Sequence, residues 1–235
     1  MMRRQIPDEV VGAIWEMNPI WAALTDAQRM QATSQMEICR YRKNAIIHRE
    51  GAIPSNMMML VSGKIKIYKE GIGQRQQIIR LLKPYDFFSY RGLVAGGPYN
   101  SFAEAIEPCV VYQLNRECFI DLLQHNNQFC FLVMRSMAGD LGAQEVKTVN
   151  LTQKHIRGRL AESLLTLKAN YGTDEDGATI SMYMSRDDLA SMSNMTTSNA
   201  IRTLSQFAQE GVVSVDGRKI KILEEEELKK ISRLG

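Results

Sequence analysis

The chain has 235 residues, of which 45% are hydrophobic and 23% are charged, and its formal net charge is +3. This length allows two domains that each bury a core, and the composition excludes a disordered or fibrous protein. No apolar run reaches the length of a membrane span, so we expect a cytoplasmic protein without a membrane partner. The scattered cysteines form no C-x-x-C pair, which argues against zinc, a disulfide framework or an iron–sulfur cluster. They are Cys39, Cys109, Cys118 and Cys130.

Short strands separated by glycines are predicted between about residues 45 and 114. Polar and apolar residues alternate over residues 64–68, Gly71-Ile72-Gly73 suits a turn, and residues 77–82 return as a second strand. Many short strands at this spacing indicate a barrel or jelly roll, which is able to enclose a ligand. The run Met57-Met58-Met59 is interpreted as core filling, because no metal-ligand spacing accompanies it.

A long helix is predicted from residue 127 to residue 151. Its residues follow a 3-4 spacing that is typical of a helix seam. Two interpretations are open at this point, a helix that packs only on its own domain and a seam between two copies of the chain. The predicted seam residues are Met134, Met137, Ala138, Leu141 and Thr148.

A helix-turn-helix is predicted after a further amphipathic helix that contains Ile156 and Leu167. Ser185 has the spacing from Asp188 at which a hydroxyl caps a helix start, and Thr196 is expected to cap the second helix. In that second helix we expect Ile201, Leu204 and Ala208 to face the core. Its other face carries Ser198, Arg202, Ser205 and Gln209.

A β-hairpin wing follows the second helix, because residues 212–215 and 218–222 flank Asp216-Gly217, a strong two-residue turn signal. A helix pair with such a wing is typical of a protein that binds duplex DNA in the major groove. Two such units need a symmetry axis between them, which favours the dimer seam. The predicted DNA-binding residues are Arg186, Thr196, Thr197, Ser198, Asn199, Arg202 and Lys219.

The order of roll, long helix and winged helix-turn-helix resembles the CRP/FNR family of bacterial transcription regulators. Residues 122–170 are similar to the family's stretch from the end of the roll through the dimer helix, and Ser185–Leu223 are similar to its helix-turn-helix and wing. The resemblance implies a homodimer that senses a small-molecule effector in the roll, binds a palindromic promoter site and contacts RNA polymerase. Such an effector acts only by binding the DNA-competent state more tightly.

The cyclic-nucleotide residues of this family are replaced here. Tyr85 and Tyr90 stand where cyclic-nucleotide binders have glycine and a ribose-binding glutamate. Their phosphate-binding Arg-Ser pair falls on Asn100-Ser101, and their adenine-contacting Thr-Ser pair on Gln144-Glu145. Loss of the arginine and the carboxylate leaves ligand groups unpaired, which argues against cyclic AMP. The candidate effector pocket comprises Phe88, Ser89, Tyr90, Asn100, Ser101, Gln144 and Glu145.

The predicted fold is α+β, with a jelly-roll β-roll of the cyclic-nucleotide-binding type, a dimerisation helix and a winged helix-turn-helix. The expected domains are 1–126, 127–151 and 152–235. No phosphate loop, metal motif or catalytic triad suggests an enzyme. The alternative function is a haem or small-molecule sensor whose helix-turn-helix mainly contacts protein. Haem ligation stays open through His48, His125 or a methionine.

Overall fold

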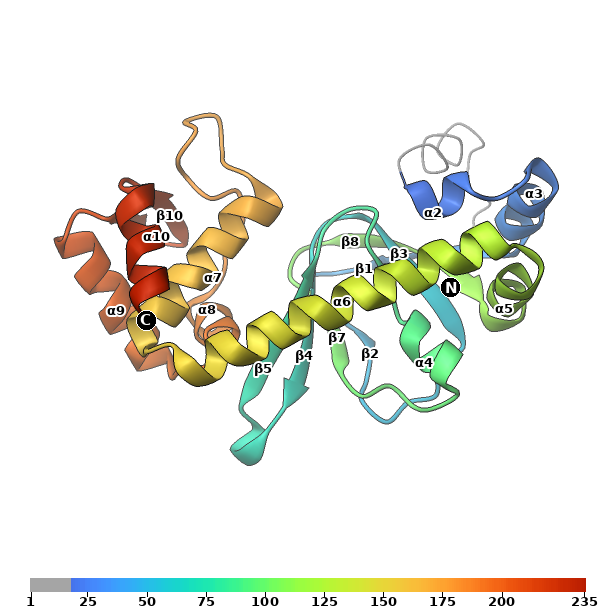
Figure 1. Ribbon diagram of the computed structural model, residues 1–235, viewed down its shortest axis with the longest axis horizontal. Coiled ribbons are helices and arrows are strands. Elements are labelled where there is room, and N and C mark those ends of the chain that lie inside the picture. The colour runs from blue at the N-terminus through green and yellow to red at the C-terminus, as the bar shows by residue number, and fades with distance from the viewer. Residues whose placement is uncertain (1–17) are drawn as a thin grey trace. The chain divides into compact units, whose positions relative to one another are not determined.

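A computed structural model of the chain describes residues 18–235 (Figure 1). The chain divides into two compact units. The first contains the described residues up to Lys69 together with Ile79–Gly142, and the second contains Glu70–Ile78 together with Ala143–Gly235. The predicted α+β fold is confirmed, with antiparallel strands in the first unit and a helical second unit that ends in a hairpin and a helix.

The first unit is built around two four-stranded sheets with the orders β1-β8-β3-β6 and β2-β7-β4-β5. Neighbouring strands run antiparallel, with Met36 opposite Leu114 and Ile65 opposite Ala105. The strands predicted at residues 64–68 and 77–82 are β4 and β5, joined through the short 3-10 turn η1 (Ile72–Gln74). The strands are β1 (Met36–Tyr41), β2 (Ile46–His48), β3 (Asn56–Ser62), β4 (Ile65–Glu70), β5 (Gln76–Leu82), β6 (Phe87–Phe88), β7 (Phe102–Ala105) and β8 (Cys109–Asn115).

Helices of the first unit enclose an aromatic core cluster. Trp21 is fully buried, its indole N–H points at the Met59 sulfur at 3.2 Å, and its ring lies 5.5 Å from that of Phe87. The three methionines Met57, Met58 and Met59 are all buried, which confirms that this run fills the core. These helices are α2 (Pro19–Ala22), α3 (Asp26–Gln35), α4 (Tyr90–Ala95) and α5 (Arg116–His125).

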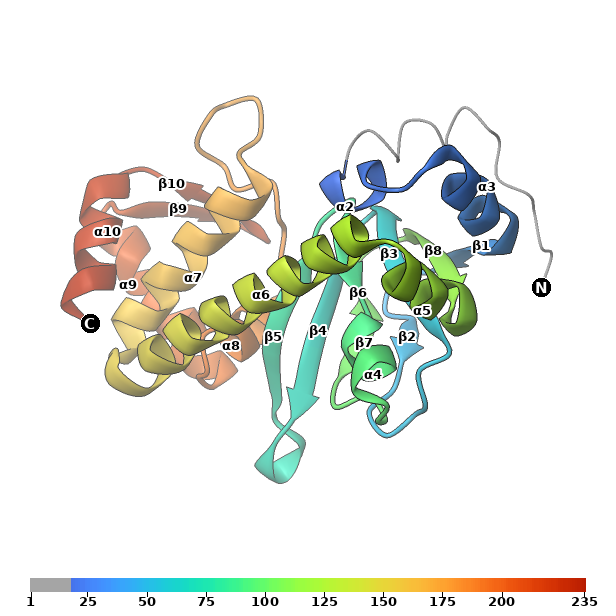
Figure 2. The same cartoon turned by 45° about the vertical axis from the view of Figure 1, so that its right-hand side comes forward.

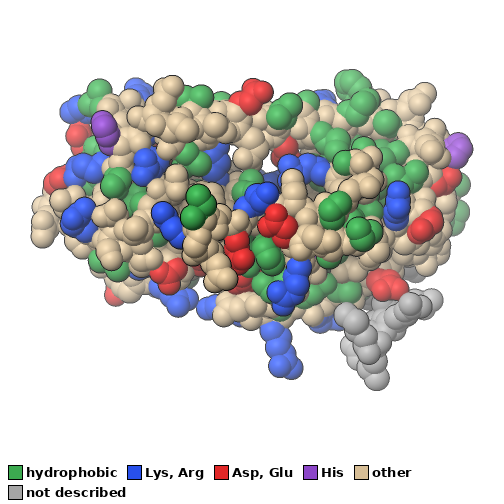
Figure 3. Space-filling view, turned by 90° about the horizontal axis from the view of Figure 1, so that it is seen from below, with side chains coloured by type: hydrophobic (Ala, Val, Ile, Leu, Met, Phe, Trp, Pro, Cys, Tyr) green, Lys and Arg blue, Asp and Glu red, His purple; other side chains and the backbone are tan. Residues whose placement is uncertain are grey.

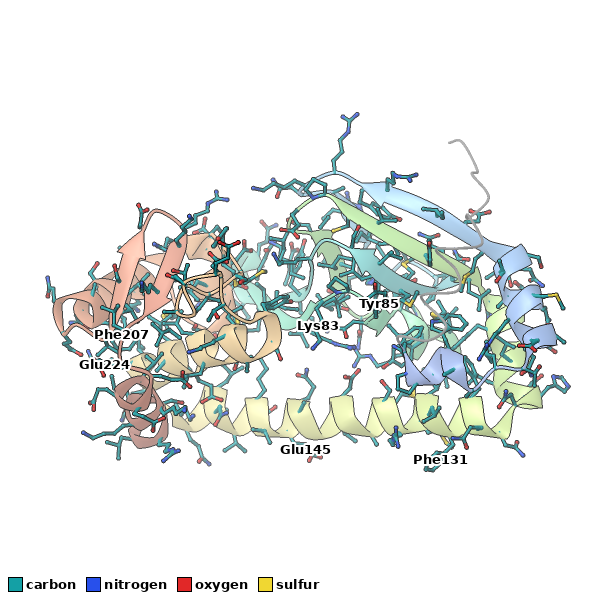
Figure 4. The ribbon with its side chains drawn as sticks, turned by 90° about the horizontal axis from the view of Figure 1, so that it is seen from above. Lys83, Tyr85, Phe131, Glu145, Phe207 and Glu224 are labelled. Carbon is teal, nitrogen blue, oxygen red and sulfur yellow. The ribbon has the colours of Figure 1, made fainter. Side chains whose placement is uncertain are left out.

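The predicted long helix is α6 (Asn127–Gln153). Its start packs on the roll through Phe129, Leu132 and Val133. Met134, Ala138, Leu141 and Thr148 are exposed, as a seam would require, and so is Phe131, which projects from α6 away from the sheets of the roll (Figure 4).

Met137 departs from that prediction, because it is half-buried and packs against the aromatic core cluster of the roll. It lies four residues after Val133 and therefore shares the roll-facing side of the helix. Phe131 precedes Met134 by three residues and, in place of Met137, belongs to the row of exposed positions with 3-4 spacing.

The second unit packs four helices and a β-hairpin together (Figure 2). The hairpin pairs Val213 with Ile222 and Asp216 with Lys219, and Gly217 has the positive φ of 54° that a tight turn requires. Val213, Ile220 and Ile222 are buried and Val215 is half-buried, so one face of the hairpin packs into the unit. The elements are α7 (Ile156–Tyr171), α8 (Arg186–Met192), α9 (Thr197–Gln209), β9 (Val213–Asp216), β10 (Lys219–Ile222) and α10 (Glu225–Leu234).

Candidate functional site

The first helix of the helix-turn-helix begins as predicted. The Ser185 hydroxyl accepts a hydrogen bond from the Asp188 N–H at 3.0 Å and donates one to the Asp188 carboxylate at 2.7 Å. This cap fixes the start of α8, whose Leu189, Ala190 and Met192 are buried.

The turn between α8 and α9 is held from helix α7. Arg159 donates from Nε to the Ser193 carbonyl at 2.9 Å and from Nη2 to the Asn194 carbonyl at 3.0 Å. The fully buried Ser193 donates its hydroxyl to that of Ser163 at 2.8 Å. Asn194 has a positive φ of 49°, a conformation that asparagine tolerates better than most residues. The turn is thus fixed by contacts that carry no local sequence signal.

Helix α9 begins with the predicted Thr196 cap, whose hydroxyl accepts from the Asn199 N–H at 3.2 Å. The expected core face is wrong in two of its three residues, because Ile201 is 48% exposed and Ala208 is exposed. Only Leu204 of that set is buried. The face that packs inward is Ala200, Thr203, Leu204 and Phe207.

The predicted and observed core faces of α9 differ because of Phe207, whose large ring is fully buried in the interior of the second unit. Placing Phe207 inward rotates the helix so that Ala200 turns in and Ile201 turns out. Phe207 is labelled in the second unit in Figure 4. The predicted outer face of Ser198, Arg202, Ser205 and Gln209 is exposed.

The polar residues at the start of α9 are held by one another and by α8. Arg202 donates from Nη2 to the Asn199 side-chain oxygen at 2.9 Å. The Thr197 hydroxyl donates to the Asp187 carboxylate at 2.7 Å. Ser198 is exposed between them. The guanidinium of Arg202 is therefore pre-oriented on the outer face while keeping donors for an incoming acceptor.

Two further predicted DNA-binding residues lie at the wing: Lys219 belongs to its strand β10, and Arg186 contacts its turn. Arg186 donates to the Gly217 carbonyl at 2.6 Å, which ties the start of α8 to the hairpin turn, and burial lowers the pKa of its guanidinium. The Lys219 ammonium lies 5.8 Å from the centre of the Tyr183 ring. Arg186 thus positions the wing in this structure.

The far end of α9 is clamped to α7. Arg157 forms a two-pronged ion pair with Glu210, at 2.9 and 2.6 Å, and its guanidinium also lies 4.9 Å from the centre of the Phe207 ring. The hydrogen bonds from Arg157 lower the pKa of Glu210. Nothing in the periodicity of the sequence pointed to this pair, which joins residues 53 positions apart.

In the roll, the predicted pocket residue Tyr90 is buried and committed to an internal contact. Its hydroxyl donates to the Asp140 carboxylate at 3.0 Å, and Arg80 pairs with the same oxygen at 2.9 Å. Burial raises the pKa of Tyr90. Tyr90 also borders an apolar pocket, and it is the one residue that this pocket shares with the predicted set. The lining residues are Ile20, Met57, Phe87, Tyr90, Phe119, Phe129, Val133 and Ser136.

The other predicted roll residues are divided between the interior and the surface. Phe88 and Ser101 are buried, whereas Asn100 is exposed. Ser89 has a positive φ of 68°, and its buried hydroxyl has no hydrogen-bond partner among the described residues. Tyr85 has a positive φ of 74°, which is the backbone conformation that glycine adopts at no steric cost.

His48 lies buried in the roll, stacked on Tyr99 with 3.9 Å between ring centres. Burial lowers its pKa to about 4, so the ring is neutral at physiological pH. Its Nδ1 has no hydrogen-bond partner within residues 18–235. His125, in contrast, is exposed and pairs with Asp121 at 2.9 Å. Within the described part of the chain, no group of three or more His, Cys, Asp and Glu is arranged to hold a metal.

Gln144 and Glu145, the α6 members of the predicted pocket, belong to the second unit. Gln144 is half-buried and Glu145 is exposed (Figure 4). Glu145 follows Leu141 by four residues on the row of exposed positions described above. The space-filling view shows basic and acidic side chains interspersed on the face that it draws (Figure 3).

Comparison with known proteins gives two domain matches. Residues 38–126 match the cyclic nucleotide-binding domain, and residues 158–231 match the Crp-like helix-turn-helix domain. A CRP-like cAMP-activated global transcriptional regulator from Mycobacterium tuberculosis is 22% identical over 86% of this chain and 90% of its own. The nitrogen fixation regulation protein FixK of Azorhizobium caulinodans is 26% identical over 74% of this chain and 70% of its own.

The fold is similar to that of FixK2 from Bradyrhizobium japonicum, with a TM-score of 0.75 and 25% identity over 83% of this chain and 96% of that one. It is also similar to a transcriptional regulator of the crp/fnr family from Eubacterium rectale, with a TM-score of 0.76 and 19% identity over 92% and 98% of the two chains. None of the helices within residues 18–235 has the length and apolar character needed to cross a membrane.

Proposed function

The chain belongs to the CRP/FNR family of transcription regulators, and from this premise we propose that it is a homodimer that binds a palindromic promoter site through α9. The observation that carries the proposal is the division of α9 into two faces. Ala200, Leu204 and Phe207 are buried, while Arg202 stands on the outer face with its guanidinium held by Asn199. An arginine held in this way is suited to bidentate recognition of a guanine in the major groove.

In this proposal, the second copy of the chain packs against the exposed apolar side chains of α6. Phe131, Met134 and Leu141 are 55%, 54% and 63% exposed, and Val146 and Val149 extend this apolar exposure toward the end of the helix. A stripe of this length on one helix is costly to leave in water, and a parallel partner helix covers it at the 3-4 spacing of a coiled coil. The twofold axis between the helices supplies the symmetry that a palindromic site requires.

The effector of this regulator is proposed to be something other than cyclic AMP. The Mycobacterium tuberculosis relative is named for activation by cAMP, but here Tyr90 stands where the ribose-binding glutamate would be and Asn100 where the phosphate-binding arginine would be. Arg80, a cation of the roll near Tyr90, is already paired with Asp140.

RNA polymerase is retained as a partner in this proposal, since regulators of this family act on promoters. The alternative of a haem sensor whose helix-turn-helix contacts protein retains one supporting feature, the buried neutral His48 with an unpartnered Nδ1. Absorbance of the purified protein with added haem tests this alternative, because axial ligation by His48 would shift and sharpen the Soret band of free haem, and His48→Phe would abolish this change.

Selection of bound duplexes from a random pool tests the main proposal. We expect enrichment of a palindrome whose half-sites lie one helical turn, about 10 base pairs, apart. We also expect affinity to fall steeply with salt concentration. Enrichment of a single half-site without symmetry would contradict the dimer, and no enrichment by a folded protein would contradict specific DNA binding.

A further inference from the structure

Ile201 is an apolar side chain in an unexpected place. It is 48% exposed on α9, at the border between the buried face of Ala200 and Leu204 and the outer face. It stands fifth in a helix of 13 residues, within the half that begins at the Thr196 cap. A lone exposed aliphatic residue is ordinary on a protein surface, so its meaning depends on what surrounds it.

The neighbours of Ile201 on this face are small and polar. Ser198 lies three residues before it and Ser205 four residues after it, and both are exposed. Residues at these spacings are adjacent on a helix surface. Ile201 is therefore the projecting group of a row flanked by two short hydroxyl side chains, and this row can approach another surface closely.

Arg202 directly follows Ile201 and is fixed by Asn199 at 2.9 Å. If Arg202 reaches a base edge, as in the function proposed above, Ile201 lies in the major groove beside it. Among the base edges of that groove, only thymine presents a methyl group, and aliphatic side chains recognise it by apolar contact. The branched side chain of isoleucine fits this contact better than any polar group would.

We propose that Ile201 is a specificity residue that contacts the 5-methyl group of a thymine in each half-site, next to the base pair that Arg202 contacts. This inference rests on the proposed function, because it needs α9 to enter the major groove. The contact excludes water from the methyl group and from the exposed part of the isoleucine side chain. Cytosine at the same position offers no methyl group, so the preference is for thymine.

The test uses the full-length protein and the palindrome obtained by selection. Each thymine pair of the two half-sites is replaced in turn by deoxyuridine, which removes only the methyl group. We expect one symmetric replacement to weaken wild-type binding about fifteenfold, that is, about fourfold for each half-site, the factor that corresponds to burying one methyl group. Ile201→Ala should bind both duplexes equally, and Ile201→Val should retain the difference.

Ile72→Ala is the matched control, since Ile72 is an exposed isoleucine in the turn η1, outside α9. It should keep the full thymine preference. The inference is overturned if no replacement affects wild-type binding, if Ile201→Ala retains the preference, or if the selected half-site contains no thymine. Arg202→Ala separates the two proposals. If this variant binds the palindrome more weakly while Ile201→Ala has no effect on the thymine preference, the proposed DNA recognition by α9 is supported and only the role of Ile201 is rejected. A protein that selects no duplex overturns both.

Discussion

The helix-turn-helix and the roll use polar side chains in opposite ways. On α9, Arg202 and Asn199 are three residues apart and face solvent, where they remain able to bind. In the roll, Arg80 and Asp140 are 60 residues apart and the pair is completed by the buried Tyr90. The first region keeps its polar groups for a partner, whereas the second uses them to hold helix α6 against its own sheets. The proposed function needs the first surface to stay open to DNA.

The buried and exposed faces of α9 provide the largest expected difference. Phe207→Ala removes a fully buried ring that also contacts Arg157, so we expect the free energy of unfolding to fall by about 3–5 kcal/mol. Ile201→Ala should change it by no more than about 0.5 kcal/mol, because the side chain is half exposed. Chemical denaturation of the full chain measures both variants. Equal destabilisation by the two substitutions would contradict the assignment of the faces.

His48 should give the stability of the roll a distinctive dependence on pH. Burial lowers its pKa from 6.5 to about 4, so the unfolded chain binds the proton more readily than the folded one. Stability from this group is therefore complete above pH 6.5 and declines as the pH falls toward 4, by about 3 kcal/mol in all.

His48→Phe provides the comparison for that pH dependence, because it keeps a ring against Tyr99 and cannot titrate. We expect the difference in unfolding free energy between the wild type and this variant to change with pH between 6.5 and 4. A difference that stays constant over this range would show that His48 titrates equally in the folded and unfolded chains.

The Arg80–Asp140 pair should matter more than a surface pair of the same charge type. Asp140→Asn leaves the partly buried Arg80 without its counter-charge, and we expect a loss of about 2 kcal/mol in unfolding free energy. Glu50→Gln is the matched control, because Glu50 pairs with Lys69 on the surface at 3.4 Å, and it should cost about 0.5 kcal/mol or less. If both substitutions lowered the unfolding free energy equally, the Arg80–Asp140 pair would contribute no more to stability than a solvent-exposed ion pair.

The parts of the fold that follow local rules could be predicted from the sequence. The caps at Ser185 and Thr196 each satisfy a backbone donor three residues away, and the Asp216-Gly217 turn lies within the hairpin that it forms. The long helix follows from its own periodicity. In each case the residues that determine the element lie within it or next to it in the sequence, so their spacing is sufficient to predict it.

Other parts could not be predicted, because the competing arrangements fit the same pattern. Ile201-Leu204-Ala208 and Ala200-Leu204-Phe207 both have helical spacing, and the choice depends on which of two faces the interior can accommodate. The clamp between Arg157 and Glu210 and the contact of Tyr90 with Asp140 join residues far apart in the chain. No local spacing indicates such pairs, and they determine which polar residues remain free to bind.

The central claim is that α9 reads DNA sequence through its outer face. The most direct measurement is the ratio of specific to nonspecific duplex affinity for the wild type, Arg202→Ala and Arg202→Lys at one fixed salt concentration. We expect Arg202→Ala to lose about 1–3 kcal/mol of specific binding with little change in nonspecific binding. Arg202→Lys should recover only part of it, since lysine lacks the planar two-donor geometry. An unchanged ratio in Arg202→Ala would contradict the account.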